Sequence, residues 1–164
     1  MSNARTFLTW ATVSFVTCTA TATAMGLTKL RRVSAMDCVA STYDERVVNY
    51  SEGVILDIDG AGVFCPFNDE YGVFDKSQVA NLDVYVYDGD SNSRIRATTC
   101  ASYATTLGST CGTYDQTTDA DAGGNYVLNP GLGGWSNASY FGYLHVVPYG
   151  TTPYQVFKGY KAYD

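Results

Sequence analysis

Short runs of alternating apolar and polar residues, separated by turn residues, constrain the fold of this chain most strongly. The clearest run is 82–87, in which Leu82, Val84 and Val86 share one side and the intervening residues share the other. A helical period is nearly absent after residue 24. Further strands are expected at 53–58, 61–65, 94–103, 125–129, 139–147 and 154–163. The sequence therefore predicts an all-β fold, an antiparallel β-sandwich or jelly roll of about seven or eight strands.

The composition excludes several classes of protein. Hydrophobic residues make up 46% of the 164 residues and charged residues 16%, against roughly 25% charged in an average soluble domain. A chain this apolar is not disordered, and one this poor in charged residues is not a coiled coil. The formal net charge of −6 argues against nucleic acid as a partner, because phosphate backbones attract basic surfaces.

The N-terminus has the features of an export signal. Arg5 precedes a mildly apolar stretch from Phe7 to Val16, and Ala22-Thr23-Ala24 fits a cleavage site for signal peptidase. We expect a signal peptide over 1–24, and cleavage after Ala22 is the second choice. The stretch is short for a membrane span, so no span is expected in the mature chain. Alternatives are a buried N-terminal strand in a protein that is not exported and a lipoprotein anchored through Cys18.

The predicted domain organisation follows from that cleavage. Residues 25–36 carry Lys29, Arg31 and Arg32 and are expected to form a flexible arm, which is either solvated or used for docking or processing. Residues 37–164 are expected to form one β-sandwich domain. The protein is expected to be secreted, to the extracellular space or the cell surface, with the periplasm as an alternative.

Four cysteines remain after the signal peptide, and an even number in an exported chain indicates disulfides. Four cysteines allow three pairings. We favour Cys100 with Cys111, because the segment between them contains Gly108 and is typical of a turn between strands; Cys38 with Cys65 then follows. Structural zinc is disfavoured because the sequence has no C-x-x-C pair and a single histidine.

A resemblance supports this arrangement. Its motifs are Val63-Phe64-Cys65-Pro66-Phe67, Val84-Tyr85-Val86-Tyr87-Asp88, Cys100…Cys111-Gly112, Tyr143-Leu144-His145-Val146-Val147-Pro148 and Tyr160. With this layout, residues 38–164 resemble a loose group of short secreted bacterial proteins. Members often carry a further cysteine near the position of His145, and its absence here strengthens the Cys38–Cys65 pairing. The resemblance implies no catalytic or ligand-binding residue.

Two acidic turns are candidate calcium sites. Asp88, Asp90 and Asn92 match the start of a calcium-binding loop that then departs from the pattern, and Asp119 and Asp121 form a second turn. Aspartate, asparagine and glycine also favour plain turns for reasons of backbone conformation. Calcium is thus a possible ligand, and no other cofactor is expected.

The sequence offers little catalytic machinery. Asp57 and Asp59 have the spacing of a carboxylate pair on one strand face, but such residues at a strand end are usually solvated. His145 lies in an aromatic run with no nucleophile-elbow motif nearby, so a structural role is favoured. An enzyme is therefore not expected.

Aromatic side chains give the best candidate ligand surface. We expect a platform for sugar rings that includes Trp135, Tyr140, Tyr143, Tyr85 and Tyr87. Trp135 is the strongest candidate because glycines place it in a loop. The alternative is that tyrosine simply fills the core and covers the outer faces.

Two functions follow from these features. The first expectation is a secreted, disulfide-linked, non-enzymatic protein with a structural, adhesive or assembly role, in which edge strands support self-association. The alternative is a carbohydrate-binding module, with or without calcium.

Overall fold

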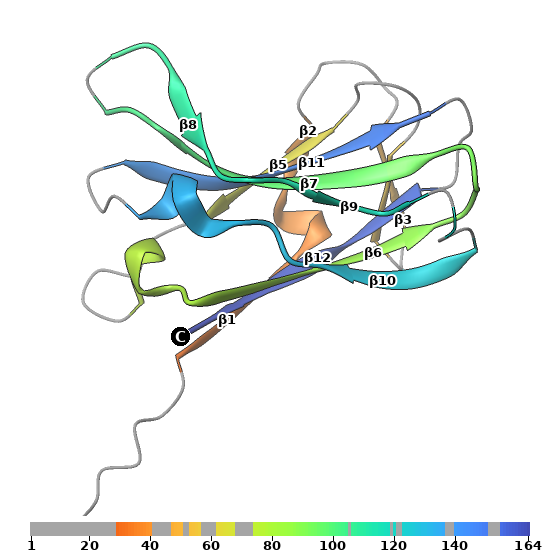
Figure 1. The fold of residues 1–164 in the computed structure, drawn as a ribbon, viewed down its shortest axis with the longest axis horizontal. Coiled ribbons are helices and arrows are strands. Elements are labelled where there is room, and N and C mark those ends of the chain that lie inside the picture. Colours follow the sequence, from red (N-terminus) through yellow and green to blue (C-terminus); the bar gives the residue numbers. More distant parts are fainter. Residues whose placement is uncertain are drawn as a thin grey trace, which may run out of the picture.

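The protein folds into two antiparallel sheets packed face to face (Figure 1). The computed structural model describes residues 29–40, 47–50, 53–56, 62–67, 74–104, 106–118, 120, 123–136, 140–150 and 155–164. Among these, helix is limited to three short 3₁₀ turns. The all-β sandwich expected from the sequence is confirmed.

The first sheet, sheet A, is built around the last strand of the chain. Its strand order is β10-β6-β12-β4-β3, and β1 also pairs with β12. These strands are β1 (Leu30–Ser34), β3 (Val47–Tyr50), β4 (Gly53–Leu56), β6 (Asn81–Asp88), β10 (Gly124–Leu128) and β12 (Gln155–Tyr163).

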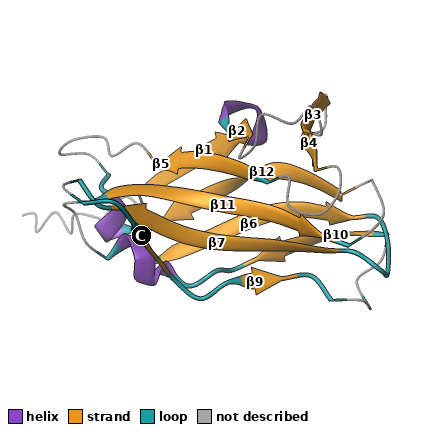
Figure 2. Cartoon of the chain, turned by 90° about the horizontal axis from the view of Figure 1, so that it is seen from above, coloured by secondary structure: helices purple, strands orange, loops and turns teal. Residues whose placement is uncertain are grey.

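The second sheet, sheet B, has the order β2-β5-β11-β7-β8, and β9 also pairs with β7. These strands are β2 (Val39–Ala40), β5 (Val63–Phe67), β7 (Arg94–Ser102), β8 (Ser109–Cys111), β9 (Asp115–Gln116) and β11 (Phe141–Tyr149). The 3₁₀ turns are η1 (Ala35–Asp37), η2 (Lys76–Gln78) and η3 (Leu132–Trp135). Seen from above, the two layers lie one behind the other (Figure 2).

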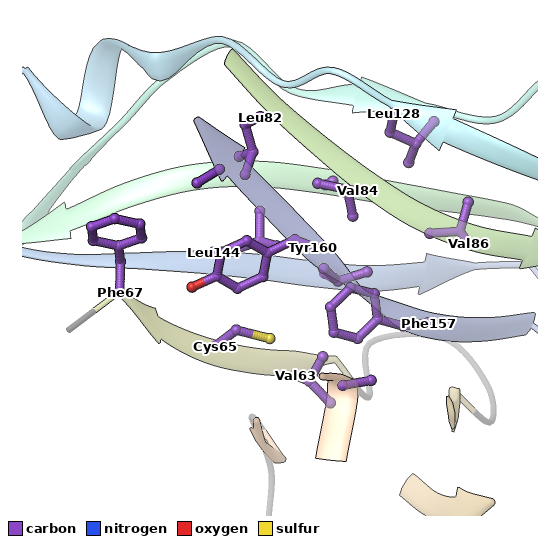
Figure 3. Packing of buried hydrophobic residues seen from close by; sticks show 14 of the residues in the cluster. Val63, Cys65, Phe67, Leu82, Val84, Val86, Leu128, Leu144, Phe157 and Tyr160 are labelled. Carbon is purple, nitrogen blue, oxygen red and sulfur yellow. The ribbon is translucent and has the colours of Figure 1, made fainter. Parts of the chain in front are cut away.

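The core lies between the sheets and is filled by inward side chains, among them those of β5, β6, β11 and β12 (Figure 3). Leu82, Val84 and Val86 of β6 are buried and the residues between them are not, which confirms the alternation predicted for 82–87. Burying a side chain of this size contributes about 1.5–3 kcal/mol. The Tyr160 hydroxyl also donates a hydrogen bond of 3.3 Å to the Pro66 carbonyl, which links β12 to β5.

Both expected disulfides are present. Cys38 bonds to Cys65, and Cys100 bonds to Cys111. The second bond joins residues directly opposite each other on β7 and β8, as expected for two strands that flank a turn. The first fixes the segment after η1 to β5.

The expected flexible arm requires a correction. Residues 30–34 form β1, which pairs along its whole length with residues 159–163 of β12. Val33 packs against the core, and the Arg31 guanidinium lies 5.3 Å from the centre of the Phe67 ring. The basic residues suggested a solvated leader, but within β1 Arg32 is exposed whereas Arg31 is half-buried and lies over the Phe67 ring. The predicted signal peptide lies outside the described residues.

Candidate functional site

The outer face of sheet A presents tyrosine side chains together with hydrogen-bonding groups. On β6, Asp83, Tyr85 and Tyr87 point outward, and Tyr85 keeps 37% of its surface exposed. The neighbouring strands add Asn125 of β10 beside Tyr87 and Tyr163 of β12 beside the start of β6. Aromatic rings and polar groups therefore share one side of three adjacent strands.

Asp83 organises the polar groups on this surface. Its carboxylate accepts hydrogen bonds from the hydroxyls of Tyr85 and Tyr163, each at 3.5 Å. The Asn129 amide donates to it at 3.1 Å, and the Lys161 ammonium lies 3.8 Å away. The side chains around Asp83 are thereby restrained before any ligand binds, which lowers the entropic cost of binding.

Two depressions lie along β6 at this surface. One, of about 250 Å³, is lined by Tyr85, Val86, Asn125, Tyr126, Val127 and Lys158. In it the Lys158 ammonium donates to the Asn125 side-chain oxygen at 2.7 Å. The other, of about 540 Å³, lies beside Asp83 and is lined by Ala80, Asn81, Leu82, Asp83, Asn129, Pro130, Gly131, Leu132 and Tyr163.

We call the outward groups of this surface the tyrosine face; it comprises Asp83, Tyr85, Tyr87, Asn125, Asn129, Lys158, Lys161 and Tyr163. Partial loss of solvent and the negative charge of Asp83 raise the pKa of the Tyr163 phenol. The phenol is therefore a neutral hydrogen-bond donor at physiological pH. Sequence reasoning found Asp83, Tyr85 and Tyr87 on one face but missed the β10 and β12 residues, because one strand does not specify its neighbours.

The expected single platform of five aromatic residues does not form. Tyr85 and Tyr87 lie on the outer face of sheet A, whereas Tyr143 points outward from sheet B, on the opposite side of the sandwich. Tyr140 packs edge-on against Tyr103, with 4.7 Å between ring centres. The set is divided because its members come from strands of different sheets.

Trp135, the strongest candidate from the sequence, is buried and cannot stack on a ligand. It is 1% exposed, and its indole Nε1 donates to the Cys100 carbonyl at 3.0 Å and to the Tyr143 carbonyl at 3.2 Å. Its ring lies 4.8 Å from that of Phe67. Trp135 is thus part of the hydrophobic core, and its prediction as a ligand-binding residue was wrong.

In the first acidic turn, the carboxylates of Asp88 and Asp90 accept hydrogen bonds from protein groups. Asp88 is fully buried and accepts hydrogen bonds from the Thr117 hydroxyl and, at 3.3 Å, from the Asp90 amide. The Asp90 carboxylate in turn accepts a hydrogen bond of 2.7 Å from the backbone N–H of Asn92. Asp119 and Asp121 lie outside the described residues, so calcium at these turns stays a prediction. In the described part of the chain, no three His, Cys, Asp or Glu side chains gather into a metal-binding group.

His145 lies on the outer face of sheet B against an aromatic ring. The Phe64 ring is 4.5 Å away, centre to centre, and burial lowers the pKa of the imidazole. Its register partners on the two neighbouring strands are Thr98 and Phe64, and neither is an acid or a nucleophile of a serine triad. The carboxylate pair Asp57 and Asp59 lies outside the described residues.

Comparison with known proteins supports the fold. The sequence matches no protein-family model and no curated protein. A solved structure described as "xylan-binding module CBM15" superposes with a TM-score of 0.56 at 11% sequence identity, covering 82% of this chain and 95% of that chain. Among the described residues, no helix is long and apolar enough to cross a membrane. At this level of identity the likeness establishes a shared β-sandwich fold.

Proposed function

We propose that this protein is a non-catalytic carbohydrate-binding module that holds a polysaccharide on the tyrosine face. The observation that carries the proposal is the presence of outward tyrosines, of which Tyr85 is exposed, and restrained polar side chains on one outer surface of a fold shared with a xylan-binding module. Sugar rings present apolar C–H faces that pack on aromatic rings, and their hydroxyls need donors and acceptors nearby.

The groups on the tyrosine face match both needs. Tyr85 and Tyr87 occupy successive outward positions on β6, about 7 Å apart along the strand, a spacing that would let one polymer contact both side chains. The Asp83 carboxylate, the Asn125 amide and the Lys158 ammonium lie within the same surface and supply acceptors and donors. The two depressions along β6 give a ligand a path beside the rings.

Location outside the cytoplasm belongs to the same proposal. Two disulfides suit an oxidising compartment, and polysaccharides occur in quantity outside the cell. The structural or adhesive role, which was the first expectation from the sequence, has less support than carbohydrate binding, because the fold comparison points to a binding module.

Affinity electrophoresis in gels that contain soluble xylan tests this proposal, with other neutral polysaccharides in parallel. A Tyr85→Ala/Tyr87→Ala double variant is expected to lose about tenfold or more in affinity, because stacking and hydrogen bonding are both removed. Phe141→Ala is the matched control, since Phe141 is 70% exposed but lies on sheet B. The proposal is contradicted if the polysaccharide retards the wild type and the double variant equally, or if only the Phe141→Ala control loses its retardation.

A further inference from the structure

Arg96 occupies an unusual position on the other side of the molecule. It points outward from β7, in the middle of sheet B, with Gln116 of β9 opposite on one side and β11 on the other. Its guanidinium carbon lies 4.0 Å from the centre of the Tyr114 ring and 4.4 Å from that of Tyr149. Two aromatic rings from opposite sides of β7 therefore hold one cation in place.

Hydrogen bonds fix the guanidinium further and leave part of it available. Nε and Nη2 donate to the same oxygen of Gln116 at 3.2 and 3.0 Å, and Nη1 donates to the Tyr149 hydroxyl at 3.4 Å. Of the five N–H groups of an arginine, the bonds to described residues use three. One N–H on each terminal nitrogen remains, which is the arrangement that binds a carboxylate through both oxygens.

A depression of about 440 Å³ lies beside this side chain. Its described lining is Ser91, Asn92, Arg94, Arg96, Gln116, Tyr149 and Gly150. Two arginines and no carboxylate belong to this lining, in a chain with 16 acidic and 10 basic residues. The described lining therefore offers cationic groups to an anion on a protein whose net charge is negative.

A glycine shapes this depression. Gly150 has a φ of +131°, and a Cβ there would lie 2.6 Å from the Asn92 carbonyl oxygen and 2.7 Å from the Ser93 Cα. The absent side chain lets the end of β11 lie directly against the turn between β6 and β7. That contact brings Asn92 and Tyr149 into one lining.

We propose that this depression, the Arg96 site, binds the carboxylate of a uronic acid residue in an acidic polysaccharide. The Arg96 guanidinium supplies paired donors, and Tyr149, which is 39% exposed, offers a ring beside the sugar. The site lies on the outer face of sheet B and the tyrosine face on that of sheet A, so the two are separate. The inference goes beyond the proposed function and does not depend on it.

The test compares variants on polygalacturonate at fixed ionic strength, by titration calorimetry. Arg96→Gln and Arg96→Lys are each expected to weaken binding about 10- to 100-fold, because lysine keeps the charge but not the planar pair of donors. Arg32→Gln removes the same charge from an exposed position on β1 of sheet A and is expected to change affinity less than twofold. Tyr85→Ala/Tyr87→Ala is expected to bind polygalacturonate as wild type does.

Two further probes define the chemistry. Methyl-esterified polygalacturonate, which lacks the free carboxylate, is expected not to bind, and dextran sulfate is expected to bind more weakly than polygalacturonate. Equal losses in Arg96→Gln and Arg32→Gln, undiminished binding of the ester, or preference for sulfate would overturn the proposal. So would full affinity in Arg96→Lys, since charge alone would then suffice. The thermal unfolding midpoint of each variant, compared with that of the wild type, checks that the variant is folded.

Discussion

At the residue scale, Trp135 shows how glycine changes the environment of a large side chain. The sequence Gly133-Gly134-Trp135 suggested an exposed loop, but the glycines instead allow close packing. A Cβ on Gly134 would lie 2.8 Å from the Thr99 carbonyl oxygen, and one on Gly142 would lie 3.3 Å from the indole Nε1. The two missing side chains make room for η3 and its indole against sheet B.

We therefore expect Trp135→Ala to lower the free energy of unfolding by about 3–5 kcal/mol, since it leaves a cavity in the core and two carbonyls without their donor. Urea denaturation followed by circular dichroism measures the change. Tyr85→Ala serves as the comparison, because a substitution at an exposed position lowers the free energy of unfolding by about 1 kcal/mol or less. A Trp135→Ala protein with wild-type stability and weaker sugar binding would restore Trp135 to the ligand site.

At the element scale, the sequence predicted the strands that cross the core and missed those that only border it. The expected strands at 53–58, 61–65, 82–87, 94–103, 125–129, 139–147 and 154–163 correspond to β4, β5, β6, β7, β10, β11 and β12. Most of these strands have one face against the core, and such strands alternate apolar and polar residues in the sequence. The missed strands β1, β2, β3, β8 and β9 have two to five residues each. The three of two or three residues are too short to show a period, and the Leu30-Arg31-Arg32 segment of β1 lacks the apolar alternation that marks a core strand. Of the eight residues of the tyrosine face, the sequence placed only Asp83, Tyr85 and Tyr87 together, because alternation orients β6 but does not identify the strands beside it.

The pairing of β1 with β12 depends on a glycine at a bulge. Gly159 has a φ of +138°, and a Cβ there would collide with the Val33 carbonyl oxygen of β1. We expect Gly159→Ala to lower the free energy of unfolding by about 1–3 kcal/mol through backbone strain. The clash with β1 adds to this loss. Urea denaturation measures the total change. Gly123→Ala is the matched control, because Gly123 also has a positive φ, +74°, but no atom within 4 Å of its Cβ position. Equal costs at both sites would show that the contact with β1 contributes nothing.

At the scale of the whole molecule, the sandwich provides two outward surfaces of different chemistry. The tyrosine face of sheet A combines aromatic rings with mixed charges, and the described lining of the Arg96 site on sheet B includes two arginines. Two stacked sheets hold these surfaces on opposite sides (Figure 2), and two disulfides fix the elements around sheet B. If both proposals hold, the protein would bind a neutral and an acidic polymer on opposite faces, which would join the binding and adhesive roles considered from the sequence.

The central claim, that the tyrosine face holds a polysaccharide, is tested most directly by a nuclear magnetic resonance titration of the ¹⁵N-labelled protein with a xylo-oligosaccharide. We predict saturable shifts of backbone amides concentrated in β6, β10 and the C-terminal half of β12, with little change in β7 and β11. No shifts with any neutral oligosaccharide tried, or shifts confined to β7 and β11, would contradict the account.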